Sequence, residues 1–317
     1  MKAAVLVLVL SLTLAWPAWA ASGCIGSALG VDAANALVLS GGGAKGAWEA
    51  GVVSALIRGG FPIQLVAGSS AGALNAAMIA DGRLDRLEEL WRTVTREQIY
   101  ALRPSVFFGG LLPGWLTLLV LDRAGSLFDA RPLRELIGRS LDLDRVRDSP
   151  VRVVVTTTDL ARRQQRLFDN QTLSIDALMA ATAVPGAFPP VEVDGELLVD
   201  GGLTGRAPIL TALEVGNRLD RVVVLVSYAA HEDGDPPTTL RRALEQSFEM
   251  TMVHQIRRET ELARLRYPRV DVQLLVPSAS LALRPLDFEP GGLARALELG
   301  RRDGAACLER WRADSPR

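Results

Sequence analysis

Histidine, cysteine and basic clusters are scarce in this chain of 317 residues. It has two histidines, two cysteines, 5% aromatic residues and a formal net charge of −1. A balanced charge, without a basic patch interleaved with aromatic residues, argues against nucleic acid as a partner. No group of His, Cys, Asp or Glu has the spacing of a metal site, so we expect no metal and no other cofactor.

Long apolar runs are also missing, except at the N-terminus. Lys2 is followed by the apolar run Ala3–Trp16 and then by small residues. This order is typical of a signal peptide, residues 1–20, because the run is short for a membrane span. An uncleaved anchor is the alternative. We therefore expect an exported protein, periplasmic or secreted, in which a small-residue linker, residues 21–34, precedes the folded part.

The two cysteines, Cys24 and Cys307, lie near the two ends of the mature chain. In an oxidising compartment a disulfide between them would join these ends. Two alternatives are left open. Ala21–Cys24 resembles a bacterial lipobox, which would make Cys24 a lipid-modified N-terminus, or else both thiols are free.

Short apolar runs alternate with helical patterns through most of the remaining chain. The apolar fraction of 49% is enough for a substantial core. The expected strands are 36–39, 64–67, 151–157, 166–168, 196–199, 221–227 and 270–276, and the clearest helices are 47–57, 238–265 and 292–301. This alternation predicts an α/β fold with three layers, α/β/α, and a mostly parallel central sheet. We expect a single domain, residues 35–317.

One segment departs from this alternation. Ser105–Val120 is rich in apolar and aromatic residues but is broken by three glycines and a proline. A buried helix does not normally contain so many breakers. We interpret the segment either as an apolar cap over a lipid-accepting cleft or as an irregular part of the core.

The stretch Gly68–Gly72 reads GSSAG and stands between an apolar strand and a helix-forming segment. This is the G-x-S-x-G pattern of a nucleophile elbow, in which the serine, here Ser70, occupies the tip of a tight, strained turn. Gly68 and Gly72 would let strand and helix approach closely. The N-terminus of the helix would then favour negative charge beside Ser70. The alternative is a structural turn of small residues.

A second glycine-rich loop, Ser40–Gly46, follows the first expected strand. Its G-x-G-x-x-G spacing also occurs in dinucleotide-binding folds, but the acidic residue that would hold the ribose is missing after the second strand. A Walker loop is excluded, since Ala47 follows Gly46 where lysine is required. The loop therefore predicts an oxyanion hole, a set of backbone N–H donors beside the serine. Its residues are Gly41, Gly42, Gly43, Lys45 and Gly46, and we expect the Lys45 side chain to be solvated.

A serine hydroxyl needs a general base. Either histidine, His231 or His254, would complete a Ser-His-Asp triad, although both lie in polar stretches. Asp200 is the better candidate, because it ends a short apolar strand and is followed by Gly201 and Gly202, which permit a tight turn. An ordinary aspartate has a pKa of about 3.9 and is a weak base. Asp200 would therefore have to be buried beside the hydroxyl.

Together the glycine loop, the elbow and the Asp200-Gly201-Gly202 turn resemble the patatin-like phospholipases. Two further stretches similar to that family are Gly125–Asp129 with Pro132-Leu133, and Ala181–Pro190. The resemblance covers about residues 36–208, which leaves 209–317 as a C-terminal α/β extension of the catalytic domain. One departure is visible. Arg206 stands where the family often has asparagine, which puts in doubt the role of that position in orienting the Asp200 turn.

The resemblance implies a Ser70–Asp200 dyad without histidine and an acyl-enzyme intermediate. The activity it implies is that of a serine acyl-ester hydrolase of the phospholipase A or lysophospholipase type. Its substrate would be a phospholipid or another lipid ester, reached through transient contact with a membrane surface. Two alternatives are a triad esterase that uses His231 or His254, and a non-catalytic lipid-binding module with a vestigial site.

Overall fold

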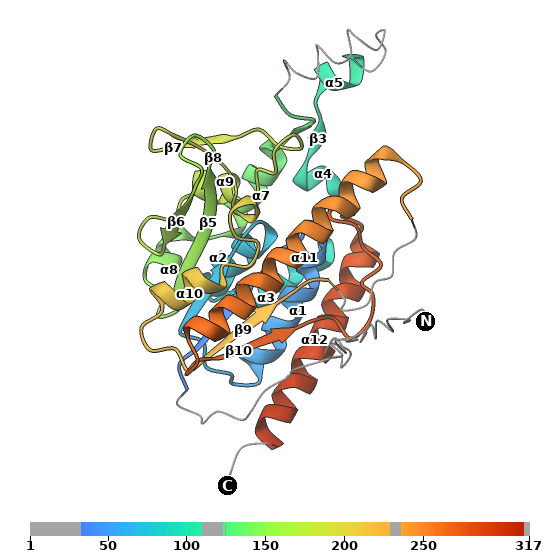
Figure 1. The fold of residues 1–317 in the computed structure, drawn as a ribbon. Helices are drawn as coiled ribbons and strands as arrows, with labels where there is room; N and C mark the ends of the chain where they lie inside the picture. Colours follow the sequence, from blue (N-terminus) through green and yellow to red (C-terminus); the bar gives the residue numbers. More distant parts are fainter. Residues whose placement is uncertain (1–32, 110–122, 124, 229–235, 314–317) are drawn as a thin grey trace, which may run out of the picture.

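The structure is a computed structural model that describes residues 33–109, 123, 125–228 and 236–313. The predicted signal peptide, nearly all of the linker with Cys24, most of the apolar segment 105–120, and His231 lie outside the described residues. Within the described part the chain forms one central sheet covered by helices (Figure 1).

The central sheet has eight strands in the described part of the chain. Five are parallel in the order β10-β9-β1-β2-β5, namely β1 Asn35–Leu39, β2 Leu65–Gly68, β5 Arg152–Asp159, β9 Arg221–Leu225 and β10 Asp271–Leu275. Three pair in antiparallel fashion, namely β6 Gln164–Asp169, β7 Val191–Val193 and β8 Glu196–Asp200. The seven strands expected from the sequence are present, and β7 was missed because three residues contain too little pattern.

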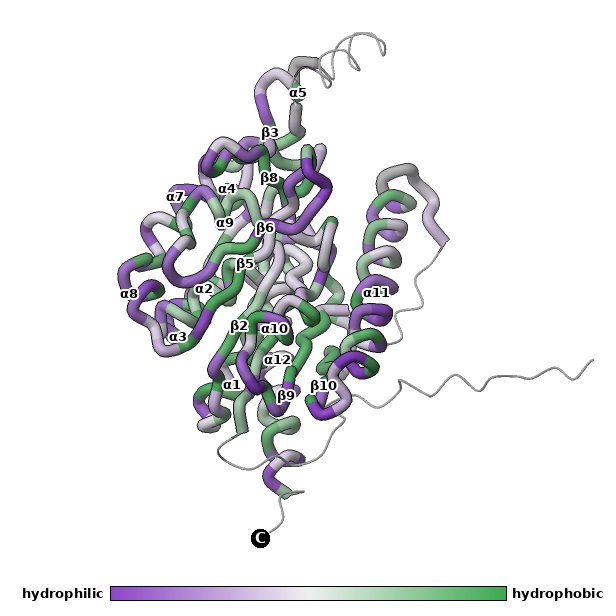
Figure 2. The backbone as a smooth tube through the Cα atoms, turned by 60° about the vertical axis from the view of Figure 1, so that its left-hand side comes forward, coloured by the Kyte–Doolittle hydropathy of each residue, from purple (hydrophilic) through white to green (hydrophobic). Residues whose placement is uncertain are grey.

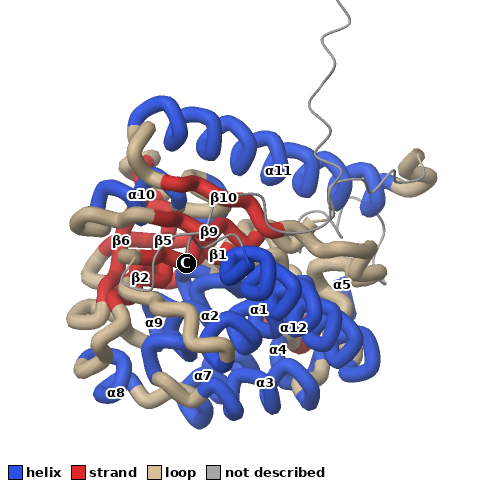
Figure 3. The backbone as a smooth tube through the Cα atoms, turned by 90° about the horizontal axis from the view of Figure 1, so that it is seen from below, coloured by secondary structure: helices blue, strands red, loops and turns tan. Residues whose placement is uncertain are grey.

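Helices cover both faces of this sheet, as the view from below shows (Figure 3). One face carries α10 Ile209–Val215 and α11 Leu240–Arg266, and the other carries α1 Gly46–Arg58, α2 Ala71–Asp81, α3 Leu84–Thr93, α7 Arg131–Ser140, α9 Ile175–Ala181 and α12 Pro290–Ala313. The predicted three-layer α/β/α fold with a mostly parallel sheet is therefore confirmed.

Strand β1 shows why helices cover both faces of the sheet. Leu37 and Leu39 belong to the core that contains α1, whereas Ala36 and Val38 belong to the core that contains α10, and all four are fully buried. Alternate side chains of a strand point to opposite faces. A strand with apolar residues at consecutive positions therefore needs helices on both sides. Figure 2, which is coloured by hydropathy, shows hydrophobic residues along the central strands.

The remaining elements are short. They are the 3-10 helices η1 Gly43–Lys45 and η2 Gly201–Leu203, the helices α4 Arg96–Ile99, α5 Pro104–Gly109 and α8 Leu143–Arg147, and the two-stranded ribbon of β3 Ala101–Leu102 with β4 Phe128–Asp129. None of the described helices is both long enough and apolar enough to cross a bilayer.

The C-terminal extension shares the sheet and the core. It supplies β9 and β10, and its last helix, α12, packs along α1. The two helices approach so closely that a Cβ on Gly51 would collide with the Leu297 carbonyl, and one on Gly300 with the Trp48 carbonyl. Cys307 on α12 is buried and disulfide-bonded.

Candidate active site

Ser70 occupies a strained turn between β2 and α2. Its φ of 55° and ψ of −132° lie in a region that residues with a Cβ rarely adopt. The turn is possible because its neighbours are glycines. A Cβ on Gly68 would collide with the Gly72 carbonyl, and one on Gly72 would lie 2.5 Å from the Leu39 oxygen. The Ser70 side chain is thereby held at the N-terminus of α2, as a nucleophile elbow requires.

Strand β5 brings the Asp200 turn to this elbow. Strands β2 and β8 both pair with the edge of β5 that faces away from β6, β2 along its first half and β8 along its second half. The strand β2 ends at Gly68, opposite Val155, and β8 ends at Asp200, opposite Thr157. Two strands that run toward each other along one edge therefore end two positions apart, which places Asp200 beside Ser70.

The two side chains form a buried pair. Ser70 is 7% exposed and Asp200 is 3% exposed. Oδ1 of Asp200 accepts the Gly202 N–H at 2.7 Å, whereas Oδ2 has no partner at hydrogen-bond distance. The Ser70 hydroxyl is nevertheless close enough to lower the pKa of Asp200 by hydrogen bonding. Catalytic hydrogen bonds are often long before substrate binds, and Oδ2 is the open acceptor in this site.

Burial raises the pKa of Asp200 above its ordinary value. The Arg206 guanidinium is the strongest opposing influence, and the Gly202 N–H and the Ser70 hydroxyl also lower the pKa. A raised pKa makes a carboxylate a better proton acceptor near neutral pH. Asp200 thus has the property that the sequence argument required of a base without histidine.

The glycine loop contains two kinds of backbone N–H group. Three of the expected oxyanion residues already donate to protein acceptors: Gly41 to Glu49 Oε1 at 2.9 Å, Lys45 to the Gly42 carbonyl at 3.3 Å, and Gly46 to carbonyls of η1. Among the hydrogen bonds of the described residues, none is donated by the N–H of Gly42 or Gly43. Both glycines line the same cavity as Ser70.

The prediction that the Lys45 side chain is solvated is wrong. Its side chain is 4% exposed rather than solvated, and its ammonium pairs with Glu249 on α11 at 3.1 Å. The ammonium also lies 4.3 Å from the centre of the Tyr228 ring. The expectation was wrong because α11, about two hundred residues further along the chain, covers the loop.

Two buried charged side chains support the loop, and sequence reasoning assigned a role to neither. Glu49 on α1 accepts the Gly41 N–H and the Ser40 hydroxyl, and burial raises its pKa to about 8, which favours its neutral form. Arg206, six residues after Asp200, is 3% exposed and donates to the Tyr228 hydroxyl at 3.3 Å. The only sequence signal for Arg206 was its departure from the family's asparagine.

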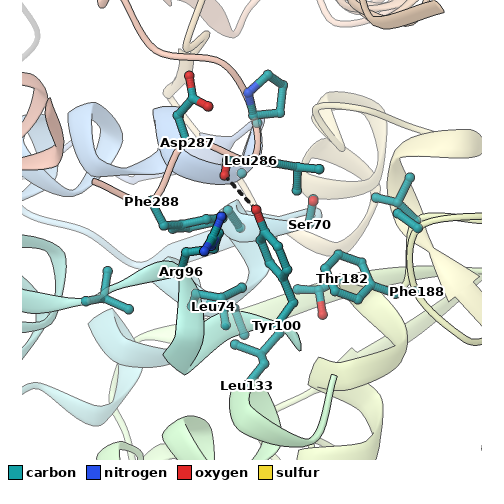
Figure 4. A pocket seen from close by; sticks show the side chains of 18 of the residues that line it. Ser70, Leu74, Arg96, Tyr100, Leu133, Thr182, Phe188, Leu286, Asp287 and Phe288 are labelled. Carbon is teal, nitrogen blue, oxygen red and sulfur yellow. Dashed lines mark hydrogen bonds between the residues drawn. The ribbon is translucent and has the colours of Figure 1, made fainter. Parts of the chain in front are cut away.

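A large apolar cavity opens at Ser70. Its volume is about 1720 Å³. Its apolar lining includes side chains of α2, α3 and α7, the residue after α4 and the segment before β7, namely Leu74, Met78, Trp91, Leu133, Ile137, Tyr100 and Phe188. Figure 4 shows Ser70, Tyr100 and Phe188 among the lining residues, with Tyr100 donating to the Leu286 carbonyl at 3.0 Å. The lining also contains charged side chains, among them Arg96, Arg206 and Asp287. The apolar part of the cavity suits a long aliphatic group.

No histidine among the described residues lines the cavity. His254 is exposed on α11, away from the cavity lining. No cluster of three or more metal-ligating side chains exists in the described part of the chain.

Known proteins with similar sequences were found. Uncharacterised NTE family proteins of Mycobacterium tuberculosis and Mycobacterium bovis are 32% identical over 207 residues, which cover 64% of this chain and 53% of theirs. Human patatin-like phospholipase domain-containing protein 6 is 28% identical over 206 residues, 64% of this chain and 14% of that protein. The chain therefore matches at most about half the length of these relatives.

Solved structures are similar at lower identity. Human GIVD cytosolic phospholipase A2, in complex with methyl gamma-linolenyl fluorophosphonate, is 13% identical, with a TM-score of 0.49 over 90% of this chain and 59% of that chain. VipD from Legionella pneumophila is 16% identical, with a TM-score of 0.44 over 88% and 67% of the two chains. The sequence model described as patatin-like phospholipase matches residues 37–213. Since this match covers more than half of the chain and contains both the elbow and the Asp200 turn, the chain belongs to the patatin-like phospholipase family.

Proposed function

We propose that the protein is a serine acyl-ester hydrolase that acts on lipids, with Ser70 as nucleophile and Asp200 as general base. One observation supports this most strongly: a serine on a strained elbow lines a mostly apolar cavity, and a buried carboxylate with an open oxygen lies beside that serine. The family membership agrees with a lipid substrate.

The proposed reaction runs in two steps. Ser70 Oγ attacks the ester carbonyl carbon while its proton passes to Asp200, and the N–H groups of Gly42 and Gly43 stabilise the oxyanion. Collapse of the tetrahedral intermediate breaks the ester bond, and the leaving alcohol takes the proton from Asp200. Water then attacks the acyl-Ser70 ester while Asp200 accepts its proton. Asp200 returns this proton to Ser70 Oγ as the acyl bond breaks, which releases the fatty acid and regenerates free Ser70.

The cavity indicates which part of the substrate it binds. Each methylene that moves from water into an apolar site contributes about 0.8 kcal/mol. Transfer of a long acyl chain into the cavity is therefore favourable. A charged headgroup gains no such transfer free energy and would stay at the mouth of the cavity. We infer cleavage of long-chain phospholipids or lysophospholipids, in the manner of a phospholipase A or lysophospholipase.

A substrate panel tests this proposal. Purified protein is incubated with a defined phospholipid, a lysophospholipid and a triacylglycerol, and released fatty acid is measured. In parallel, a fluorophosphonate probe is applied and the labelled peptide is mapped. We expect fatty acid release from at least one phospholipid and label on Ser70. An unlabelled Ser70 with no fatty acid release would favour a non-catalytic lipid-binding module instead.

The mouth of the cavity has an exposed apolar rim that would contact a lipid surface. The rim side chains Leu244 and Phe248, one turn apart on α11, are 63% and 37% exposed, and Leu286 opposite is 37% exposed. Exposed apolar groups around a cleft are typical of contact with lipid or protein. The open acyl cavity behind them favours lipid.

We expect the double substitution Leu244→Asp, Phe248→Asp to weaken binding to phospholipid vesicles by about tenfold or more, since apolar burial in the interface is lost. Vesicle co-sedimentation measures this change. Hydrolysis of a soluble short-chain ester should stay within about twofold of the unmodified protein. Leu262→Asp, Leu265→Asp is the matched control, because these residues are also exposed on α11 but do not line the cavity. Equal loss in both variants would refute a specific rim.

A further inference from the structure

We propose that Arg206 is a positioning residue of the site: its guanidinium holds the Asp200 turn and the oxyanion loop together and keeps a cation beside the negative charge throughout the reaction. The inference rests on the proposed function of Ser70 and Asp200. The comparisons assign no role to this position, and an arginine here departs from the asparagine that the family often has.

The guanidinium reaches both halves of the site. Nη1 lies 3.1 Å from the place that a Cβ on Gly202 would occupy, and Nη2 lies 3.4 Å from the corresponding place on Gly42. Both glycines therefore leave room for Arg206. The guanidinium occupies the space between the turn that carries Asp200 and the loop that carries the open oxyanion donors, and Arg206 lines the cavity.

Two hydrogen bonds to residues outside these two turns hold Arg206 in place. Nη2 donates to the Tyr228 hydroxyl at 3.3 Å, and the backbone N–H of Arg206 donates to Gln255 on α11 at 3.3 Å. Its Nε has no hydrogen-bond partner although it is buried. Planar guanidinium groups bind in a fixed orientation, so Arg206 acts as a rigid spacer as well as a charge.

Several ionisable groups surround Arg206, and Asp200 is one of them. Among the described residues, those near the site include Asp200, Glu49, Tyr228, Lys45, Glu249 and Glu245. Lys45 and Glu249 pair with each other. Burial raises the pKa of Glu49 to about 8, which favours its neutral form. Buried charges need partners of opposite sign, and Asp200 is one of the groups that attract the guanidinium, together with Tyr228 and Glu49.

The position of Arg206 matters because the negative charge moves from Asp200 to the substrate oxygen during the reaction. Asp200 must be ionised to act as a base, and its negative charge is then on the side of the guanidinium that lies beside Gly202. When Asp200 accepts the Ser70 proton, the negative charge appears on the substrate oxygen at Gly42 and Gly43, on the other side. The guanidinium lies beside both Gly202 and Gly42, so the cation is close to the charge before and after the transfer. Fixed charges of this kind lower the barrier without reorganisation.

The test compares Arg206→Met with Arg206→Lys, which keeps the charge, and uses a soluble short-chain ester so that vesicle binding plays no part. We expect Arg206→Met to lower kcat by on the order of 100-fold, with KM within about threefold. The acidic limb of its kcat profile should move to higher pH, because removal of the cation raises the pKa of Asp200. Arg206→Lys should keep the acidic limb of the unmodified protein and much of kcat.

Other outcomes would overturn the inference. An acidic limb that does not move in an active Arg206→Met variant would leave Arg206 a merely structural residue. A large rise in KM with unchanged kcat would make it a headgroup-binding residue. If Arg206→Met does not fold, the pH dependence of fluorophosphonate labelling in Arg206→Asn gives the same readout. If the unmodified protein neither hydrolyses the ester nor labels, the proposed function fails rather than this inference.

Discussion

Ser70→Ala is expected to lower kcat for ester hydrolysis by about 10⁴-fold or more. Without Oγ no acyl-enzyme can form, and the remaining groups only bind and polarise the ester. The substitution changes few contacts, because no hydrogen bond in the described part of the chain depends on Ser70 Oγ apart from its approach to Asp200. Fatty acid release and fluorophosphonate labelling, measured on the same preparation, should both be lost.

Ser69→Ala is the matched control for this prediction. Ser69 precedes the nucleophile on the same elbow, is fully buried, and its Oγ has no hydrogen-bond partner. The substitution should leave kcat within about threefold of the unmodified protein. If Ser70→Ala retains activity while Ser69→Ala loses it, the nucleophile has been assigned to the wrong serine. Equal loss in both variants would point to collapse of the turn, which thermal melting would reveal.

Asp200→Asn is expected to lower kcat by about 10⁴-fold and to raise the melting temperature at neutral pH. An amide cannot take the Ser70 proton, although its oxygen still accepts the Gly202 N–H. The stability gain follows from the raised pKa of Asp200, which already includes the attraction of Arg206. A group whose pKa is raised by folding favours its neutral form. The folded protein therefore loses stability as pH rises above the ordinary aspartate value through the folded one, and asparagine removes that loss.

Thermal melting of both proteins between pH 3 and pH 8 measures this effect, and the two curves should converge at the acidic end. The kinetic control is the double variant His231→Ala, His254→Ala, which should keep nearly full activity. Loss of activity in the histidine variant, together with activity retained in Asp200→Asn, would replace the dyad with a histidine-dependent mechanism. A lower melting temperature for Asp200→Asn at neutral pH would contradict the sign of the pKa shift.

Much of the fold was predictable because its signals are local. Buried parallel strands need apolar residues at consecutive positions, and such runs predicted β1, β9 and β10 within two residues of their ends. The strands that were missed, β3, β4 and β7, have two or three residues each. Their pairing partners, rather than their own side chains, make them strands.

The sequence by itself determined the elbow and the Asp200 turn, because each depends on neighbouring residues. Glycines at positions 68 and 72 permit the close contacts of the Ser70 turn, and the glycines after Asp200 let the chain reverse. Only the tertiary structure decided which backbone N–H groups of the glycine loop are open, that Lys45 is buried, and that Arg206 lies between the two halves of the site. Those facts depend on contacts with Glu49 on α1, with α11 and with Tyr228 after β9. A local pattern cannot specify partners that only the packing of distant elements brings together.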